Sequence, residues 1–130
     1  MIRLGVVGYG RRIHGVIEHV VRPLAPEVRV VAIVDPDEAG VRGRLAPCDR
    51  DAAFYPDLAS LMRRGRPDAL AIGTRCNLHA PFAVQAARYD LPLFLEKPVA
   101  VSMAQATALE RAFRRSRCPV VVSFPLRVSP

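Results

Sequence analysis

A strand, a glycine turn and a helix follow one another at the N-terminus, and this pattern constrains the fold more than any other feature of the chain. A short apolar run over residues 4–7 leads into Gly8 and Gly10, and a helical pattern begins directly afterwards. Gly8 allows a sharp turn at the end of the strand, and Gly10, which has no Cβ, lets the backbone approach a diphosphate. The first N–H groups of the helix would point at that anion. The residues expected to bind a dinucleotide here are Gly8, Tyr9, Gly10, Arg11, Arg12 and Ile13.

The glycine motif is incomplete, because Ile13 stands where G-x-G-x-x-G places its third glycine. That position normally brings the helix close to the strand. A branched side chain therefore implies a wider separation, or a close approach at Gly15 instead. The same letters contain the beginning of a P-loop, but Val16 and Ile17 replace the lysine and the serine or threonine that bind phosphate and Mg²⁺, so we exclude that motif. The alternative to a dinucleotide-binding turn is a glycine turn between any buried strand and helix.

Asp35 supplies a second element of a dinucleotide-binding fingerprint. It follows the apolar strand pattern of residues 28–34. It lies about 20 residues beyond the glycine turn, where a carboxylate hydrogen-bonds the adenosine ribose. Its negative charge would repel a 2′-phosphate and so favours NAD over NADP, whereas Arg42 or Arg44 could reverse that preference. The alternative for Asp35 is a helix N-cap or an Asx turn.

Strand and helix patterns alternate along the chain. The expected helices cover residues 13–21, 38–45, 57–62, 81–87 and 102–115, and the expected strands cover residues 4–7, 28–34, 69–74, 91–95 and 120–124, with a brief strand near residue 54. Apolar strands alternating with helices predict an α/β fold, a doubly wound parallel sheet of about six strands, as one domain over residues 1–130. Ligands of such sheets bind at the carboxyl ends of the strands. Gly8, Asp35, Thr74 to His79 and residues 96–98 should therefore line one edge.

Three local signals define individual helices. The first helix carries an apolar stripe that is expected to face the sheet, formed by Ile13, Val16, Ile17, Val20 and Val21. Asp57 is the expected N-cap of the helix that follows it. Ser102 and Gln105 have the spacing of a capping box at the start of the last helix.

Composition and charge exclude several other classes of protein. The cysteines are three, widely spaced and without a C-x-x-C pair, which predicts reduced thiols in a cytoplasmic protein and no metal site. The glycine turn interrupts any signal peptide, and no apolar run is long enough to cross a membrane. The net charge of +7 comes from 18 arginines and a single lysine, Lys97. Arg111, Arg114 and Arg115 share one helix face, for which a solvated surface is favoured over nucleic-acid binding because no aromatics interleave.

Several segments, read together, resemble the Gfo/Idh/MocA family of oxidoreductases (glucose–fructose oxidoreductase, inositol dehydrogenase). GVVGYGR resembles the family's cofactor turn, and VVAIVDPD resembles its second strand. FYPDLASLM and RPDALAIGTRCNLHAPFAVQAA resemble its middle section. LPLFLEKPVAVSMAQATAL resembles its hallmark segment, and VVVSFPLRVSP resembles the end of its nucleotide-binding domain. The triplet Glu96-Lys97-Pro98 after an N-x-H loop is the most specific of these features.

The resemblance implies that NAD or NADP is the cofactor and that hydride moves to or from a hydroxyl-bearing carbon of a sugar or cyclitol. It places Lys97 beside the nicotinamide and the substrate hydroxyl as a catalytic residue, with Glu96 orienting it. A lysine there can polarise a carbonyl or help to move a proton. The remaining residues implied near the nicotinamide and the diphosphate are Thr74, Asn77 and His79. An ordinary structural histidine is the alternative for His79.

The chain departs from the family in its length. Family members carry a second α/β domain that supplies most of the substrate pocket, and this chain ends at Pro130, about where that domain would begin. We therefore expect an incomplete active site in this chain, with a second chain supplying the missing domain, or a homo-oligomer that pairs through the surface the second domain would cover. A stand-alone, non-catalytic dinucleotide-binding module that acts as a sensor or regulatory partner is the alternative function.

Overall fold

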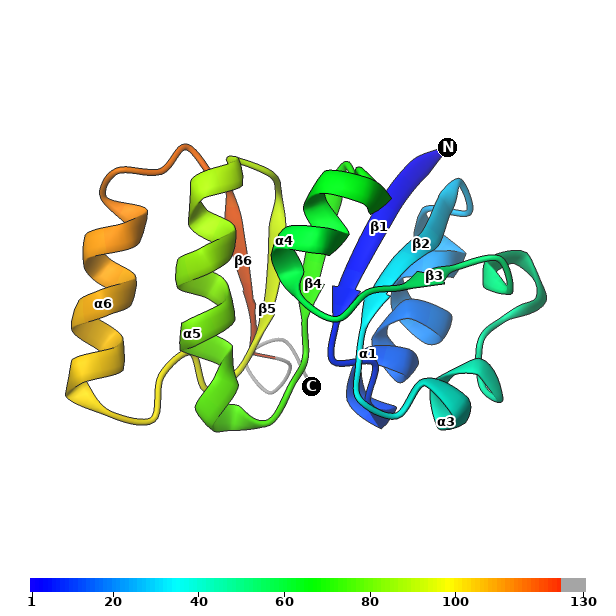
Figure 1. Cartoon of the computed structure of the whole chain (residues 1–130), viewed down its shortest axis with the longest axis horizontal. Helices are drawn as coiled ribbons and strands as arrows, with labels where there is room; N and C mark the ends of the chain where they lie inside the picture. The colour runs from blue at the N-terminus through cyan, green and yellow to red at the C-terminus, as the bar shows by residue number, and fades with distance from the viewer. Residues whose placement is uncertain (125–130) are drawn as a thin grey trace.

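Six strands form one parallel sheet in the computed structural model, which describes residues 1–124 (Figure 1). The strands are β1 (Ile2–Val7), β2 (Val28–Val34), β3 (Ala53–Phe54), β4 (Ala69–Ile72), β5 (Leu93–Glu96) and β6 (Val120–Ser123). Their order across the sheet is β3-β2-β1-β4-β5-β6, and every neighbouring pair is parallel. The order reverses between β1 and β4, which confirms the predicted doubly wound sheet. The expected end of the domain at Pro130 lies outside the described residues.

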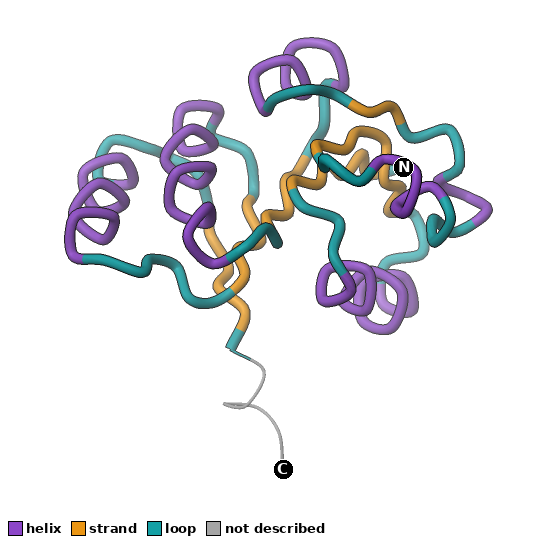
Figure 2. Tube along the Cα trace, turned by 60° about the horizontal axis from the view of Figure 1, so that its bottom comes forward, coloured by secondary structure: helices purple, strands orange, loops and turns teal. Residues whose placement is uncertain are grey.

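Helices cover both faces of the sheet but do so unevenly. One face carries α4 (Leu58–Ser60), η3 (Leu61–Gly65), α5 (Cys76–Ala86), η4 (Ala87–Tyr89) and α6 (Met103–Phe113). The other face carries α1 (Arg11–Val16), η1 (Ile17–Val21) and α2 (Arg22–Leu24), which lie behind β1 and β2 in Figure 1 and below the strands in Figure 2. The link from β2 to β3 holds α3 (Glu38–Arg42) and η2 (Pro47–Asp49). Within residues 1–124, no helix lies over β5 and β6 on the α1 side.

Apart from Arg3 in β1 and Arg29 in β2, the central strands β1, β2 and β4 carry no charged or polar side chain, because both of their faces are buried. Val6 belongs to the core on the α1 side and Val7 to the core on the α5 side, and neither is exposed to solvent. Successive side chains of a strand point to opposite faces, so each residue of such a run packs against a different layer of helices. This explains why β2 and β4 show no alternation of polar and apolar residues.

The helix after β4 begins earlier than its sequence pattern predicts. Residues 75–79 were expected to form a loop before Pro81, but α5 starts at Cys76 and contains Pro81 in its interior. Proline has no N–H, so the carbonyl of Asn77 loses its helical partner. The side-chain amide of Gln105 donates to that carbonyl at 2.9 Å. A contact from α6 thus allows the helix to tolerate its proline.

The helix after the glycine turn departs from regular α-helical geometry beyond Val16. Residues 11–24 are helical without a break, but the η1 section is π-helical. Ile13 and Ile17 are buried as predicted, whereas Val20 is 51% exposed. A π-helical turn holds more residues than an α-helical turn, so the spacing that placed Val20 inward no longer applies. The predicted apolar stripe is correct at its start and wrong at Val20.

Both predicted helix caps are confirmed. The Asp57 carboxylate accepts a hydrogen bond from the N–H of Ser60 at 2.7 Å, and this contact lowers the pKa of Asp57. The Ser102 hydroxyl accepts from the N–H of Gln105 at 3.2 Å. The Gln105 side chain returns a contact to the N–H of Val101 at 2.9 Å, so the capping box closes one residue earlier than its usual form.

Candidate functional site

Gly8 forms the sharp turn that leads out of β1. Its φ of 81° lies in the left-handed region, and its N–H donates to the carbonyl of Val34 at 2.8 Å. A Cβ at this position would lie 2.6 Å from the main-chain nitrogen of Thr74. Side chains avoid that φ, and the neighbouring backbone leaves no room for one, so the site requires glycine. The turn brings the ends of β1, β2 and β4 together.

The missing third glycine of the motif is replaced by a glycine that directly follows another strand. A Cβ at Gly73, which follows β4, would lie only 1.8 Å from Cγ1 of the fully buried Ile13. Nothing lies within 4 Å of a Cβ at Gly15. Of the two alternatives that the sequence offered here, a close approach at Gly15 is therefore wrong. Ile13 instead packs into the space that Gly73 leaves open.

The Asp35 carboxylate lies against the glycine turn. Its Oδ2 accepts a hydrogen bond from the N–H of Tyr9 at 2.7 Å, and its Oδ1 accepts one from the N–H of Asp37 at 2.8 Å. The second contact is the Asx turn that the sequence left as an alternative. A carboxylate has about four acceptor positions, so capacity for two hydroxyl groups remains. The Asx turn and a ribose contact are thus compatible.

A cavity of about 640 Å³ opens at this edge of the sheet. Its lining consists of Val7, Gly8, Gly10, Val34, Asp35, Pro36, Tyr55, Pro56, Gly73, Thr74, Arg75, Leu78 and Phe82. Asp35 and Arg75 are the charged members of that lining, and most of the others are apolar. Cavities of a few hundred Å³ with apolar walls and few polar groups are typical of small-molecule sites.

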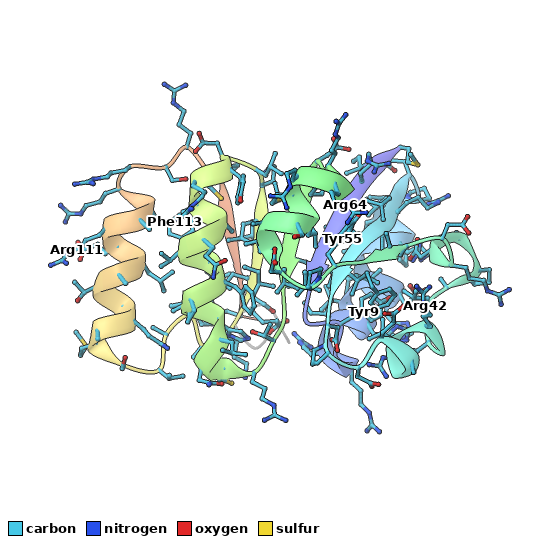
Figure 3. The ribbon with its side chains drawn as sticks, in the orientation of Figure 1. Tyr9, Arg42, Tyr55, Arg64, Arg111 and Phe113 are labelled. Atoms are coloured by element: carbon cyan, nitrogen blue, oxygen red, sulfur yellow. The ribbon has the colours of Figure 1, made fainter. Side chains whose placement is uncertain are left out.

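The walls of the cavity include residues that sequence reasoning missed. Tyr55 and Pro56 follow β3, and Phe82 lies on α5, whereas Leu78, also on α5, belongs to the segment 74–79 that was expected at this edge. Tyr55 is labelled in Figure 3 beside Arg64, whose guanidinium lies 5.8 Å from the centroid of its ring. An aromatic residue directly after a short strand was the one available signal.

Tyr9 lies in the glycine turn, and its side chain points away from the cavity. Its side chain is fully buried in the core on the α1 side and does not belong to the cavity lining (Figure 3). Burial raises the pKa of Tyr9 to about 12, with smaller contributions from the charges of Glu18 and Asp49. The phenol therefore remains protonated at neutral pH. Any contact between Tyr9 and a cofactor would have to come from its main chain.

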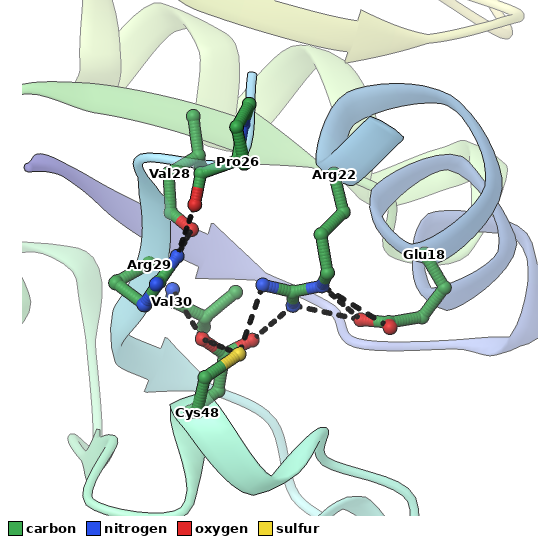
Figure 4. A network of polar contacts seen from close by, with 8 residues as sticks. Glu18, Arg22, Pro26, Val28, Arg29, Val30 and Cys48 are labelled. Carbon is green, nitrogen blue, oxygen red and sulfur yellow. Dashed lines mark hydrogen bonds and ion pairs between the residues drawn. The ribbon is translucent and has the colours of Figure 1, made fainter. Parts of the chain in front are cut away.

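An ion-pair network connects the helical segment of residues 11–24 to β2 (Figure 4). The Arg22 guanidinium contacts the carboxylates of Glu18 at 2.8 Å and Asp49 at 2.6 Å, and its Nη1 lies 3.0 Å from Sγ of Cys48. The Asp49 side chain is fully buried, and its Oδ1 also accepts from the N–H of Val30 at 3.1 Å. The hydrogen bond from Arg22 is the main cause that lowers the pKa of Glu18.

Glu96 contacts Arg12 of the first helix. The Nε of Arg12 lies 3.0 Å from Oε1 of Glu96, and its Nη2 lies 3.3 Å from the hydroxyl of Ser123. The Glu96 side chain is 5% exposed and that of Arg12 is 53% exposed, so a buried carboxylate pairs with a partly solvated guanidinium and joins the start of α1 to the ends of β5 and β6. Lys97 is exposed, and its amine has no hydrogen bond or ion pair with residues 1–124. Glu96 therefore orients Arg12 directly and Lys97 only through the main chain.

His79 joins two loops at the same edge. The side chain is buried, with Nδ1 2.8 Å from the carbonyl of Pro98 and Nε2 3.0 Å from the carbonyl of Thr74. The ring thus holds the end of β4 against the segment after β5. Thr74 lines the cavity, whereas Asn77 is exposed on the first turn of α5. Of Thr74, Asn77 and His79, Thr74 alone belongs to the described cavity lining, which Arg75 and Leu78 of the same segment also join.

The two arginines that could bind a 2′-phosphate are engaged elsewhere. Arg42 contacts Glu38 at 2.8 Å, and its guanidinium lies 4.5 Å from the ring centroid of Phe54. Arg44 donates to the carbonyl of Tyr9 at 3.2 Å and lies 4.0 Å from the carboxylate of Asp37. Neither belongs to the described lining of the cavity.

Three other features bear on function. Within residues 1–124, no helix has the length and apolar character needed to cross a membrane. The same part of the chain holds no cluster of three or more His, Cys, Asp or Glu side chains that could bind a metal ion.

Arg111 projects from the outer side of α6, whereas Phe113 packs toward the core (Figure 3). That Arg111, Arg114 and Arg115 form a solvated surface rather than a nucleic-acid-binding one remains a prediction.

Comparison with known proteins identifies similar sequences and folds. The sequence model described as "Oxidoreductase family, NAD-binding Rossmann fold" matches residues 2–124. An inositol 2-dehydrogenase from Burkholderia multivorans is 30% identical over 101 residues, which are 78% of this chain and 30% of that protein. The chain thus spans about a third of the length of its curated relative.

Solved structures share the fold. The myo-inositol dehydrogenase of Lactobacillus casei, solved with NAD(H) and myo-inositol, superimposes with a TM-score of 0.81 at 24% identity, covering 99% of this chain and 38% of that one. The WlbA dehydrogenase of Bordetella pertussis, solved with NADH and UDP-GlcNAcA, gives a TM-score of 0.76 at 23% identity over 94% of this chain and 36% of that one.

Proposed function

Because the chain belongs to the Gfo/Idh/MocA family of oxidoreductases, with its NAD-binding Rossmann fold, we propose that it holds a nicotinamide dinucleotide in the cavity between Gly8 and Asp35. There it serves hydride transfer to or from a hydroxyl-bearing carbon of a sugar or cyclitol. The cavity carries the proposal, since it joins the glycine turn, the acidic strand end and apolar walls in one place. The inositol dehydrogenases among its relatives support a polyol substrate.

The residues present fit an adenine dinucleotide. The ribose hydroxyls would take the free acceptor positions of Asp35, and the adenine would lie against apolar side chains such as Tyr55 and Phe82. The diphosphate would lie at Gly10, where a Cβ would approach no other atom closer than 3.9 Å. The engagement of Arg42 and Arg44 with other partners supports NAD over NADP.

Lys97 is the residue proposed for proton handling. When bound, the nicotinamide supplies the hydride donor or acceptor. Lys97 leaves the carboxyl end of β5 at the same edge of the sheet and is exposed without a partner in residues 1–124. Its ammonium group would hold the substrate oxygen and exchange a proton with it. His79 and the Arg12–Glu96 pair would fix the segment that carries it.

Ligand binding tests the cofactor assignment. We expect NAD to raise the melting temperature of this chain and NADP to raise it less. Asp35→Ser should weaken NAD binding and narrow the difference between the two nucleotides, because the charge that repels the 2′-phosphate is removed. The measurement is the ratio of the dissociation constants for NAD and NADP. The substitution also removes the contact between Asp35 and the N–H of Tyr9, but that loss would weaken the binding of both nucleotides alike and leave the ratio unchanged. No response to either nucleotide at millimolar concentration would contradict the proposal.

Turnover separates an enzyme from a binding module. The chain is assayed with NAD and a panel of polyols, and Lys97→Met is the matched variant. Reduction of NAD that depends on Lys97 would support catalysis by this chain. Binding of NAD without turnover of any polyol would favour the stand-alone module.

Self-association is proposed for the sheet face that no described helix covers. Val121 of β6 is 65% exposed on it. Two copies that pair through this face would bury apolar area that is costly to leave in water. Sedimentation equilibrium should show a dimer that Val121→Glu disrupts, and a monomer at high concentration would overturn the idea.

A further inference from the structure

Arg75 lies at the mouth of the cavity without a partner. It is the N-cap residue of α5, it is exposed, and its side chain belongs to the cavity lining. Its guanidinium makes no hydrogen bond or ion pair with any of residues 1–124. Arg12 and Arg44, which also lie near the glycine turn, are already bound to Glu96 and to the carbonyl of Tyr9. Arg11 and Lys97 also make no hydrogen bond or ion pair through their side chains with residues 1–124, but neither belongs to the described cavity lining, so Arg75 is the available cation within that lining.

The backbone that carries Arg75 touches the glycine turn. A Cβ at Gly8 would lie 2.6 Å from the nitrogen of Thr74, and a Cβ at Gly10 would lie 3.9 Å from the carbonyl oxygen of Gly73. Arg75 is therefore one residue beyond the closest approach between the ends of β1 and β4. The eleven-residue helix α5 begins directly after it, so the first N–H groups of α5 face the same edge. These features place Arg75 beside the position expected for a diphosphate.

A cation beside the diphosphate would offset the negative charge that the cavity and the bound dinucleotide carry together. Asp35 supplies a negative charge, and the diphosphate linkage of a dinucleotide supplies two more. Among the described lining residues, Arg75 alone offsets them. A guanidinium also matches phosphate oxygens in shape, since it donates two parallel hydrogen bonds.

We propose that Arg75 binds the diphosphate of the dinucleotide and is a main source of its affinity, a role that rests on the dinucleotide binding proposed above. The adenine wall at Tyr55 and Phe82 is apolar and does not need a charge. The Arg75 guanidinium therefore binds the phosphates, and the adenine contacts the apolar side chains.

Calorimetric titration of NAD, ADP and adenosine into three variants tests the role of Arg75. Arg75→Ala should weaken NAD and ADP binding about tenfold or more, as expected for lost charge-assisted hydrogen bonds, and should leave adenosine binding unchanged. Arg75→Lys should recover much of the loss, because an ammonium group still pairs with phosphate. Arg88→Ala is the matched control, since Arg88 is exposed beyond the opposite end of α5, roughly 20 Å away along the helix axis.

Salt dependence gives a second readout. Wild-type affinity for NAD should fall as ionic strength rises, and Arg75→Ala should fall less steeply. Unchanged NAD binding in Arg75→Ala would overturn the proposal, and so would an equal loss of adenosine binding, which would indicate stacking on the base. If the wild-type chain binds neither NAD nor ADP, both this role and the proposed function fail. If the wild-type chain binds NAD and the Arg75→Ala variant binds it equally well, the role of Arg75 is refuted and the proposed function is not.

Discussion

Substitution of Gly73 by alanine tests whether this glycine has taken over the role of the missing third glycine. The new Cβ would lie 1.8 Å from Cγ1 of Ile13, which is fully buried and branched. Overpacking of this kind costs about 1–3 kcal/mol, and the severe overlap places Gly73→Ala at the upper end. Loss of glycine freedom in the unfolded chain returns about 0.4–1 kcal/mol. We expect a net loss of about 2 kcal/mol in the free energy of unfolding.

A double-mutant cycle with Ile13→Ala isolates the contact. Ile13→Ala alone should cost about 2–5 kcal/mol. In that background the nearest atom to the new Cβ is Cβ of residue 13 at 3.2 Å, so Gly73→Ala should be close to neutral. The expected coupling is therefore about 2 kcal/mol. Gly15→Ala is the control, since nothing lies within 4 Å of its Cβ, and it should stabilise the helix by about 0.5–1 kcal/mol.

Urea unfolding followed by circular dichroism suits these measurements, because the chain contains no tryptophan. If Gly73→Ala costs the same in both backgrounds, within about 0.3–0.5 kcal/mol, the two residues do not share one space and our explanation of the motif is wrong. A stabilising Gly73→Ala would contradict it equally.

Three further outcomes are expected. Arg22→Met should lower the free energy of unfolding by about 3–5 kcal/mol, since it leaves the buried Asp49 carboxylate without its cation; urea unfolding measures this, and a loss below about 1 kcal/mol would contradict it. The pKa of Glu18 is lowered from its ordinary value of 4.5 by the bond from Arg22, so the pair stabilises the fold above that value and is lost as the pH falls below it. Melting temperatures recorded against pH should therefore fall less steeply below pH 4.5 in Glu18→Gln than in the wild type, and parallel curves would refute the linkage. A melting scan of His79→Phe should show a destabilised fold, because the two carbonyls at Thr74 and Pro98 lose their shared partner.

The sequence was sufficient to predict the architecture because the signals were local. The glycine turn, the apolar strands and the caps at Asp57 and Ser102 each depend on residues within one element, and the structure confirms each of them. The acidic end of β2 could be placed for the same reason. Alternation of strand and helix then fixed the edge at which these residues meet.

The predictions that failed depended on contacts between distant segments. Pro81 was read as the start of a helix, because nothing in the local sequence shows that the Gln105 side chain satisfies the Asn77 carbonyl. Val20 was placed inward because apolar spacing cannot reveal a π-helical turn. A close approach of helix and strand at Gly15 was one of two alternatives, although the glycine that makes room for Ile13 is Gly73, sixty residues away in the chain. In each case the deciding partner comes from another element.

The same distinction applies to the charged residues at the edge of the sheet. A triplet of Glu96, Lys97 and Pro98 suggests that the glutamate orients the lysine beside it, yet alternate residues of an extended strand end point in opposite directions. Glu96 points into the protein, where Arg12 and Ser123 meet it, and Lys97 points out. The Glu96 carboxylate thus pairs with Arg12 of α1, and the Lys97 ammonium group has no partner in residues 1–124. The arrangement thus couples the position of the turn to the segment that carries Lys97, and no pattern within that segment could have shown it.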